Sequence, residues 1–234
     1  MLVANGDSFV HEYHLNDIDR WSNIIKVDTN LAVGAGSNDR TFLTTIEHIH
    51  NHDVKTLILG WTNWERSYFN KSNGSRYKLI GGDAIDEMLG DKFNEPDVAK
   101  FYLTKVFNDF TQLKNTLVQM IHIQELCKLK DIKLINFATV FDADDLDKEN
   151  LTRVAKTAFM SRVDKDVETM GIRYNFSVLE TYIRKLDSSC WVNNQVFSSM
   201  STILKDYPKP SDTDPHIGVE GSKKWAEILL NHLY

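Results

Sequence analysis

The chain has 234 residues, of which 42% are apolar and 26% are charged, as in an ordinary water-soluble globular domain. Its net charge of −6 argues against a general nucleic-acid-binding surface. No apolar run approaches the roughly 20 residues that a membrane-spanning helix requires, and the first residues lack the basic and long apolar segments of a signal peptide. We therefore expect a cytoplasmic protein that has no membrane span and no nucleic-acid partner.

Two cysteines, Cys127 and Cys190, are present, and neither belongs to a C-x-x-C pair, so a zinc ribbon is not indicated. One disulfide between them is an alternative, but free thiols in a reducing compartment are favoured. Cys127 falls within a helical pattern, where we expect it to pack in the core.

Strand and helix signals alternate along the first part of the chain. Apolar runs predict strands at 2–4, 23–27 and 54–61. The third run is nearly continuous, as expected for a strand that is covered on both faces. Between the second and third runs, apolar residues three to four positions apart predict a helix at 41–50.

Residues 66–98 interrupt this alternation with turn-rich sequence, and we predict an insertion at the rim of the sheet. A long helix at about 99–129 and a strand at 132–138 follow. Patterns within 142–200 favour helices, and the last helix is expected at 219–233. The apolar stripe that we expect the long helix to bury consists of Val106, Phe110, Leu113, Leu117 and Ile121.

Strands that are separated by helices imply parallel pairing through right-handed crossovers. We therefore predict a single α/β domain over residues 1–234, a three-layer α/β/α sandwich with a central, mainly parallel sheet.

Four short stretches carry residue types that could do chemistry. The first is NGDSF at 5–9, which puts Ser8 at the carboxyl end of the first strand. NLAVGAGSND at 30–39 and LGWTN at 59–63 also follow predicted strands, and DTDPHIGVEG at 212–221 precedes the last helix. Since the carboxyl ends of parallel strands share one edge, where open α/β sheets bind ligands, we expect the four stretches to converge there.

In this order, the four stretches resemble the motif blocks of the SGNH hydrolases, also called GDSL esterases. The resemblance extends from one end of the chain to the other but rests on these short blocks, and residues 66–98 and 142–200 match none of them. It implies the flavodoxin-like sheet of that family and a serine esterase that needs no metal and no organic cofactor.

The chemistry of ester cleavage explains these residue types. A serine hydroxyl needs a base to remove its proton, the base needs an orienting carboxylate, and the developing oxyanion needs prearranged donors. The resemblance implies Ser8 as the nucleophile and His216 as the base. It implies oxyanion donors in the backbone N–H of Ser8, the backbone around Gly34 and Gly36, and the side chain of Asn63.

The acid position departs from the family pattern, which has a carboxylate three residues before the histidine, where this chain has Thr213. Pro215 favours extended backbone before it, and residues two apart in an extended chain point to the same side. We therefore expect Asp214 to orient His216, with Asp212 as the reserve.

The asparagine position departs as well, because the family pattern would put this residue at Thr62 and the chain has Asn63 one place later. Thr62 is therefore the reserve donor. Trp61, Trp64 and Arg66 follow the same strand and could bind the substrate, with the aromatic pair stacking on a sugar ring or an acyl chain; packing of that pair in the core or at the rim fits equally well.

Several alternatives stay open. The substrate is expected to be a small-molecule or carbohydrate ester, an O-acetyl ester first, and acyl transfer would use the same residues. The alternative from another class is a catalytically inactive SGNH-fold domain that binds carbohydrate or another ligand. His48 and His52 share a helix face, but no third ligand is evident, so a metal site is disfavoured. His11 and His14 lie close to Ser8 in the sequence and could line the rim of the pocket, but surface positions are favoured for both.

Overall fold

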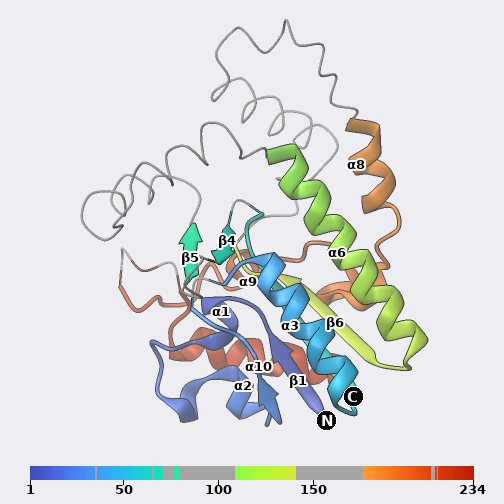
Figure 1. Cartoon of the computed structure of the whole chain (residues 1–234). Helices are drawn as coiled ribbons and strands as arrows, with labels where there is room; N and C mark the ends of the chain where they lie inside the picture. The colour runs from blue at the N-terminus through green and yellow to red at the C-terminus, as the bar shows by residue number, and fades with distance from the viewer. Residues whose placement is uncertain are drawn as a thin grey trace, which may run out of the picture.

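The structure is a computed structural model, and it describes residues 1–34, 36–64, 66–70, 76–79, 109–140, 176–211, 214 and 216–234. A four-stranded parallel sheet in the order β2-β1-β3-β6 forms its centre (Figure 1). The strands are β1 (Leu2–Asn5), β2 (Thr29–Asn30), β3 (Thr56–Trp61) and β6 (Lys133–Ala138). The chain adds β2 on one side of β1 and β3 on the other, so the sheet has a switch point at β1, where such sheets bind ligands.

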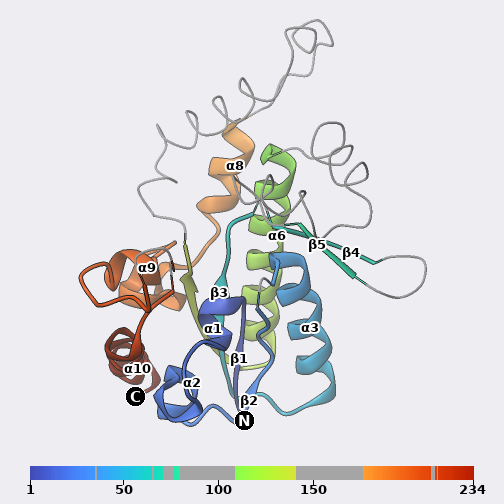
Figure 2. The same ribbon diagram turned by 90° about the vertical axis from the view of Figure 1, so that its left-hand side faces the viewer.

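Helices cover both faces of this sheet (Figure 2). One face packs against α3 (Asn38–Asn51), α6 (Asp109–Leu129) and α8 (Phe176–Ile183), and the other against α2 (Trp21–Ile24), α9 (Met200–Ile203) and α10 (Val219–Leu233). The predicted three-layer α/β/α architecture with a parallel sheet is therefore confirmed.

The apolar sequence of β3 follows from this double cover. Leu57 and Leu59 belong to the core on the α3 and α6 side, whereas Ile58 between them belongs to the core on the α10 side. All three side chains are fully buried. Because alternate residues of a strand point to opposite faces, a strand covered on both faces reads as a continuous apolar run.

The strand predicted at 23–27 is wrong. Residues up to Ile24 belong to α2, Lys26 takes a left-handed backbone conformation just after it, and the strand β2 lies at Thr29–Asn30. Trp21 at the start of α2 is fully buried and anchors this turn of helix against α10. A run of five residues carries too few periods to separate a buried helical turn from a strand.

The other elements predicted in the described part of the chain are confirmed. The helix at 41–50 is α3, which begins earlier because the Ser37 side chain accepts a hydrogen bond from the Arg40 N–H. The runs at 54–61 and 132–138 form β3 and β6, and the last helix is α10.

The long helix is described from Asp109 onward, so Val106 lies outside the described residues. Leu113 and Leu117 of the predicted stripe are buried, but Ile121 lies at its flank and is only partly buried. Cys127 continues the buried stripe in the core, as expected, and both cysteines are free thiols. No helix in the described ranges is both long and apolar enough to cross a membrane.

Only part of the predicted rim insertion is described. It contains the strands β4 (Ser67–Asn70) and β5 (Arg76–Leu79), which pair antiparallel in a separate two-stranded sheet. The helical patterns at 142–175 lie outside the described residues. The rim insertion and the single domain over residues 1–234 therefore stay predictions.

Glu12 is fully buried and links the short helix α1 (Ser8–His11) to the start of α2. Its backbone N–H donates to the Ser8 carbonyl at the end of α1, and its Oε2 accepts from the Trp21 N–H at 2.7 Å. Burial raises the pKa of Glu12 to about 8, against the smaller opposing effects of the Ser222 side chain, the Trp21 hydrogen bond and the Arg20 charge. The folded protein therefore favours the protonated form of this side chain.

We predict that Glu12→Gln flattens the dependence of folding stability on pH. The pKa of Glu12 is higher in the folded protein than in the unfolded chain. Its contribution to the free energy of unfolding is therefore complete below pH 4.5 and decreases as the pH rises toward 8, by at most about 1.4 kcal/mol per pH unit. Glutamine keeps the acceptor for Trp21 but cannot ionise. Urea unfolding at pH 5, 6.5 and 8 measures the slope, with the exposed Glu47→Gln as control; parallel curves for wild type and Glu12→Gln would refute the prediction.

Candidate active site

The turn between β1 and α1 brings Ser8 to the carboxyl edge of the sheet. Gly6 has φ +155°, and a Cβ built on it would lie 2.8 Å from the Gly60 carbonyl oxygen and 2.5 Å from Val10 Cγ2. Glycine therefore lets this turn cross directly over the backbone of β3. Ser8 is the first residue of α1 and is almost fully buried.

Ser8, His216 and Asp214 form one chain of hydrogen bonds. Ser8 Oγ lies 2.8 Å from His216 Nε2, and His216 Nδ1 lies 2.5 Å from Asp214 Oδ1, which also accepts from the His216 backbone N–H at 2.9 Å. Burial acts to raise the pKa of Asp214, but its hydrogen bonds with His216 outweigh burial and hold that pKa below its usual value. An ionised carboxylate can only accept, so Nδ1 carries a proton, and in the tautomer with its single proton on Nδ1 the ring can accept at Nε2 from the Ser8 hydroxyl.

The reserve acid Asp212 lies outside the described residues, as do Thr213 and Pro215. The structure brings Asp214 to His216 with side chains two positions apart on the same side. Among the described residues, Asp214 is thus the carboxylate that contacts the imidazole, and the contact does not require Asp212.

Three rings pack against His216 within the described part of the chain. The centroid of its ring lies 4.7 Å from that of Phe9, 4.8 Å from that of His14 and 5.8 Å from that of Tyr13. His14 Nε2 donates to the Ile217 carbonyl at 2.8 Å, because a carbonyl oxygen can only accept. The rim alternative therefore applies to His14, which is partly buried beside His216 and ties the segment after α1 to the residue that follows His216. His11 is also partly buried.

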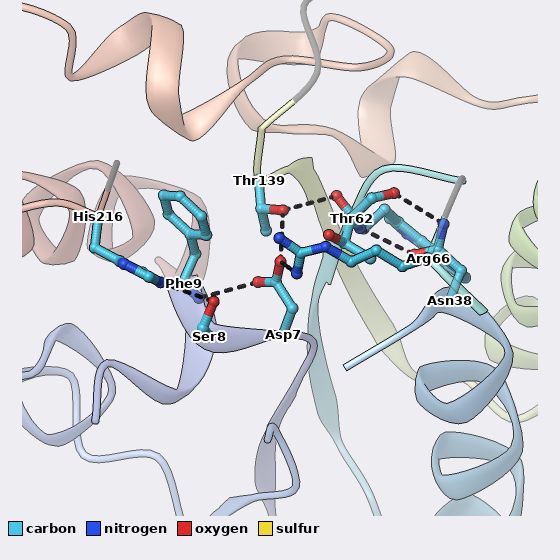
Figure 3. Close-up of polar contacts among 9 residues, drawn as sticks. Asp7, Ser8, Phe9, Asn38, Thr62, Arg66, Thr139 and His216 are labelled. Atoms are coloured by element: carbon cyan, nitrogen blue, oxygen red, sulfur yellow. Dashed lines mark hydrogen bonds and ion pairs between the residues drawn. The ribbon is translucent and has the colours of Figure 1, made fainter. Parts of the chain in front are cut away.

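Asp7 precedes the serine and is fully buried. Figure 3 shows its carboxylate between Ser8 and the guanidinium of Arg66. Oδ1 accepts from the Phe9 N–H at 3.0 Å and caps α1, while Oδ2 accepts from Arg66 Nη1 at 2.8 Å and from Thr139 Oγ1 at 3.2 Å. Arg66, predicted to bind substrate, is thus occupied by an internal ion pair beside the serine.

Asn38 holds the loop that follows β3. Its Oδ1 accepts from the Thr62 N–H at 2.9 Å, and its Nδ2 donates to the Thr62 carbonyl at 2.8 Å (Figure 3). This pairing fixes the backbone next to Asn63. The Thr62 hydroxyl is buried without a hydrogen-bond partner among the residues described, while Asn63 is only partly buried, so Asn63 is the more accessible of the two donor candidates.

The two glycines of the second motif have different surroundings. The Gly36 N–H donates to the Val33 carbonyl at 3.1 Å, so in this conformation it is engaged in a turn. A Cβ on Gly36 would lie 3.0 Å from the Gly6 carbonyl oxygen, which places this glycine against the Gly-Asp-Ser turn. Gly34 faces the ring of Tyr13, and Ala35 between the glycines lies outside the described residues.

The predicted aromatic pair lies in the core. Trp61 is fully buried and its Nε1 donates to Asn136 Oδ1 at 3.0 Å, and Trp64 is buried in the same cluster, against α6. Their rings fill the space between sheet and helix, so neither presents a surface on which a substrate could stack. The core-packing alternative applies to both.

His48 and His52 lie far from this edge. Their rings stack with centroids 4.2 Å apart, and His48 Nε2 lies 3.4 Å from Met1 Sδ, at the amino end of β1. Over the described ranges, no group of three or more His, Cys, Asp or Glu side chains is arranged to hold a metal ion.

The sequence reasoning assigned no role to Asp7, Asn38 or Thr139. Asp7 and Asn38 stand inside the quoted motifs, but their partners are 59 and 24 positions away. Nothing in the local pattern marks Thr139 except its position directly after β6.

No protein-family model matches the sequence, and no curated protein matches it. Among solved structures, the chain is similar to a GDSL-like lipase from Bacteroides thetaiotaomicron, with 12% identity, a TM-score of 0.46, and 98% of this chain and 85% of that chain covered. A G-D-S-L family protein from Desulfitobacterium hafniense matches with 13% identity and a TM-score of 0.49, over 99% of this chain and 98% of that chain. An acetyl xylan esterase matches with 9% identity and a TM-score of 0.47, over 100% of both chains.

We predict that Arg66→Gln lowers the free energy of unfolding by about 3–5 kcal/mol, because it leaves the Asp7 carboxylate buried without its counter-charge. In Arg66→Gln combined with Asp7→Asn, the loss should be smaller than in Arg66→Gln alone. Urea unfolding of both single variants and the double variant measures this coupling.

Arg184→Gln serves as the matched control, since Arg184 is largely exposed and its pairing with Glu180 at 3.8 Å should contribute less than about 1 kcal/mol. Losses that simply add in the double variant would contradict the assignment of Arg66 as the partner that compensates Asp7.

Proposed function

We propose that this protein is a serine esterase of the SGNH type that cleaves acyl esters, with Ser8 as nucleophile, His216 as general base and Asp214 as the orienting acid. The observation that carries the proposal is the unbroken chain of hydrogen bonds from Ser8 Oγ through both ring nitrogens of His216 to the Asp214 carboxylate. A neutral imidazole oriented in this way is what a serine hydroxyl needs to lose its proton as it attacks.

The reaction would proceed by double displacement. Ser8 Oγ attacks the ester carbonyl while His216 Nε2 takes the hydroxyl proton, and the tetrahedral intermediate collapses as Nε2–H protonates the leaving alcohol. Water, deprotonated by the same nitrogen, then attacks the acyl-serine and releases the acid. Asp214 stays ionised throughout and stabilises the imidazolium.

The oxyanion would be stabilised by the Ser8 N–H, the Asn63 side chain and the backbone near Gly34. Asn38 supports this role of Asn63, because it holds the preceding residue by both backbone groups. An O-acetyl ester is our first substrate; transfer of the acyl group to another alcohol instead of water would use the same residues.

A catalytically inactive domain that binds carbohydrate or another ligand in the same place is the second candidate. It is favoured by one observation, the engagement of the Gly36 N–H with Val33, which removes one of the expected donors from the oxyanion site. The nucleophilicity of Ser8 separates the two candidates.

We predict that a fluorophosphonate probe labels the wild type and not Ser8→Ala, because only an activated serine attacks the phosphorus. The exposed Ser188→Ala should label like the wild type. Mass spectrometry of the labelled peptide identifies the site, and circular dichroism checks folding. A folded wild type that takes up no label would support the binding domain.

Asp214→Asn should lower kcat for an acetyl ester by about 10³- to 10⁴-fold, because an amide can donate to Nδ1 and so stabilise the wrong tautomer of the imidazole. The exposed Asp206→Asn is the control and should keep wild-type kcat. A loss of less than tenfold at Asp214, with folding intact, would assign the orienting role to a different group.

A further inference from the structure

The three rings around His216 differ in their access to solvent. Phe9 is buried beneath the imidazole, and His14 is partly buried and bound to the Ile217 carbonyl. Tyr13, in contrast, is 56% exposed. The side of the imidazole that meets solvent is therefore bordered by Tyr13.

The backbone holds Tyr13 in this place. Glu12 takes a left-handed conformation (φ 48°) that ends α1, and its carbonyl accepts from the Leu15 N–H to close a turn around Tyr13. The Glu12 side chain is buried, so the next side chain points outward. The Tyr13 ring makes T-shaped contacts with the rings of His216 and His14, and its Cδ1 lies 3.6 Å from the position that a Cβ on Gly34 would take.

This position defines which part of an ester would contact Tyr13. In the proposed reaction, the leaving alcohol must lie within hydrogen-bonding distance of His216 Nε2 to receive its proton. A leaving group larger than a few atoms then extends along the exposed border of the imidazole, where the Tyr13 ring lies. Trp61 and Trp64, the other aromatic candidates, are buried and cannot supply this surface.

The surroundings of the ring favour a polar leaving group. The His11 ring centroid lies 6.3 Å from that of Tyr13, His14 is in edge contact, and the partly exposed Asp214 carboxylate adjoins His216. A hydrocarbon chain laid here would take the partly exposed Asp214 carboxylate out of water without giving it a new hydrogen bond. A pyranose presents a C–H face that fits an aromatic ring, and it carries hydroxyls that can donate to the Asp214 carboxylate.

We propose that the exposed face of Tyr13 is the stacking platform for a pyranose ring in the leaving alcohol, so that the substrate is an O-acylated carbohydrate. This inference rests on the proposed esterase function for the place of the leaving group. It makes Tyr13 a residue that determines specificity for the alcohol rather than for the acyl group.

The kinetic test compares two acetyl esters that differ only in the alcohol, a mono-O-acetylated methyl glucopyranoside and methyl acetate. In Tyr13→Ala, the ratio of kcat/KM for the sugar ester to that for methyl acetate should fall about tenfold, as expected for loss of a stacking contact. Tyr13→Phe should keep the ratio, and so should Tyr234→Ala, which removes a fully exposed tyrosine elsewhere. An equal loss on both esters would overturn the proposal, because Tyr13 would then only support His216.

A binding measurement separates failure of this inference from failure of the esterase assignment. The same sugar ester is titrated by NMR into Ser8→Ala and into Ser8→Ala combined with Tyr13→Ala. About tenfold weaker binding in the double variant supports the platform even if the wild type turns over neither ester. Equal affinities, or no binding to Ser8→Ala, would overturn it.

Discussion

The neutralisation of one buried carboxylate, that of Asp7, is the constraint on which the candidate site depends. Asp7 follows β1, and its partners Arg66 and Thr139 follow β3 and β6, so a single side chain joins the carboxyl ends of three neighbouring strands. A buried carboxylate is tolerated only when it is paired and hydrogen-bonded. Since Ser8 comes next in the chain, the bonds that satisfy Asp7 also determine where the serine hydroxyl lies.

His216 and Asp214, near the C-terminal end of the sequence, lie beside Ser8 in the folded chain. His14 and Ile217 are 203 positions apart, yet their hydrogen bond holds the segment that carries His216 against the turn after β1. Phe9, directly after Ser8, packs on the same imidazole. The ring is thus positioned by packing, by its neighbour's backbone and by Asp214, independently of its bond to Ser8. Such preorganisation is what electrostatic catalysis requires.

The pattern of apolar residues predicted the local structure correctly where burial alone determined it. The run at 54–61 had to be a strand, because five consecutive positions of β3, from Leu57 to Trp61, are buried and Leu57, Ile58 and Leu59 alternate between two cores. The run at 23–27 contains the end of a helical turn that the buried Trp21 anchors and a chain reversal at Lys26. Five residues are too few for their periodicity to distinguish this arrangement from a strand. Of the two alternatives for Trp61, core packing applies, and substrate binding by Arg66 stays a prediction. Following a strand places a residue near the edge of the sheet but does not say whether it faces the core, an ion pair or solvent.

By itself, the sequence determined the alternation of strands and helices, and with it the parallel sheet and the polar residues at its carboxyl edge, because these follow from the periodicity of apolar residues along short segments. It also placed Ser8 and His216 at the two ends of the chain. Only the tertiary structure decided which polar groups meet, joining Asp7 to Arg66, Asn38 to Thr62 and His14 to Ile217. Each of these bonds depends on the packing of a whole helix or strand against the sheet, which no local run of residues specifies.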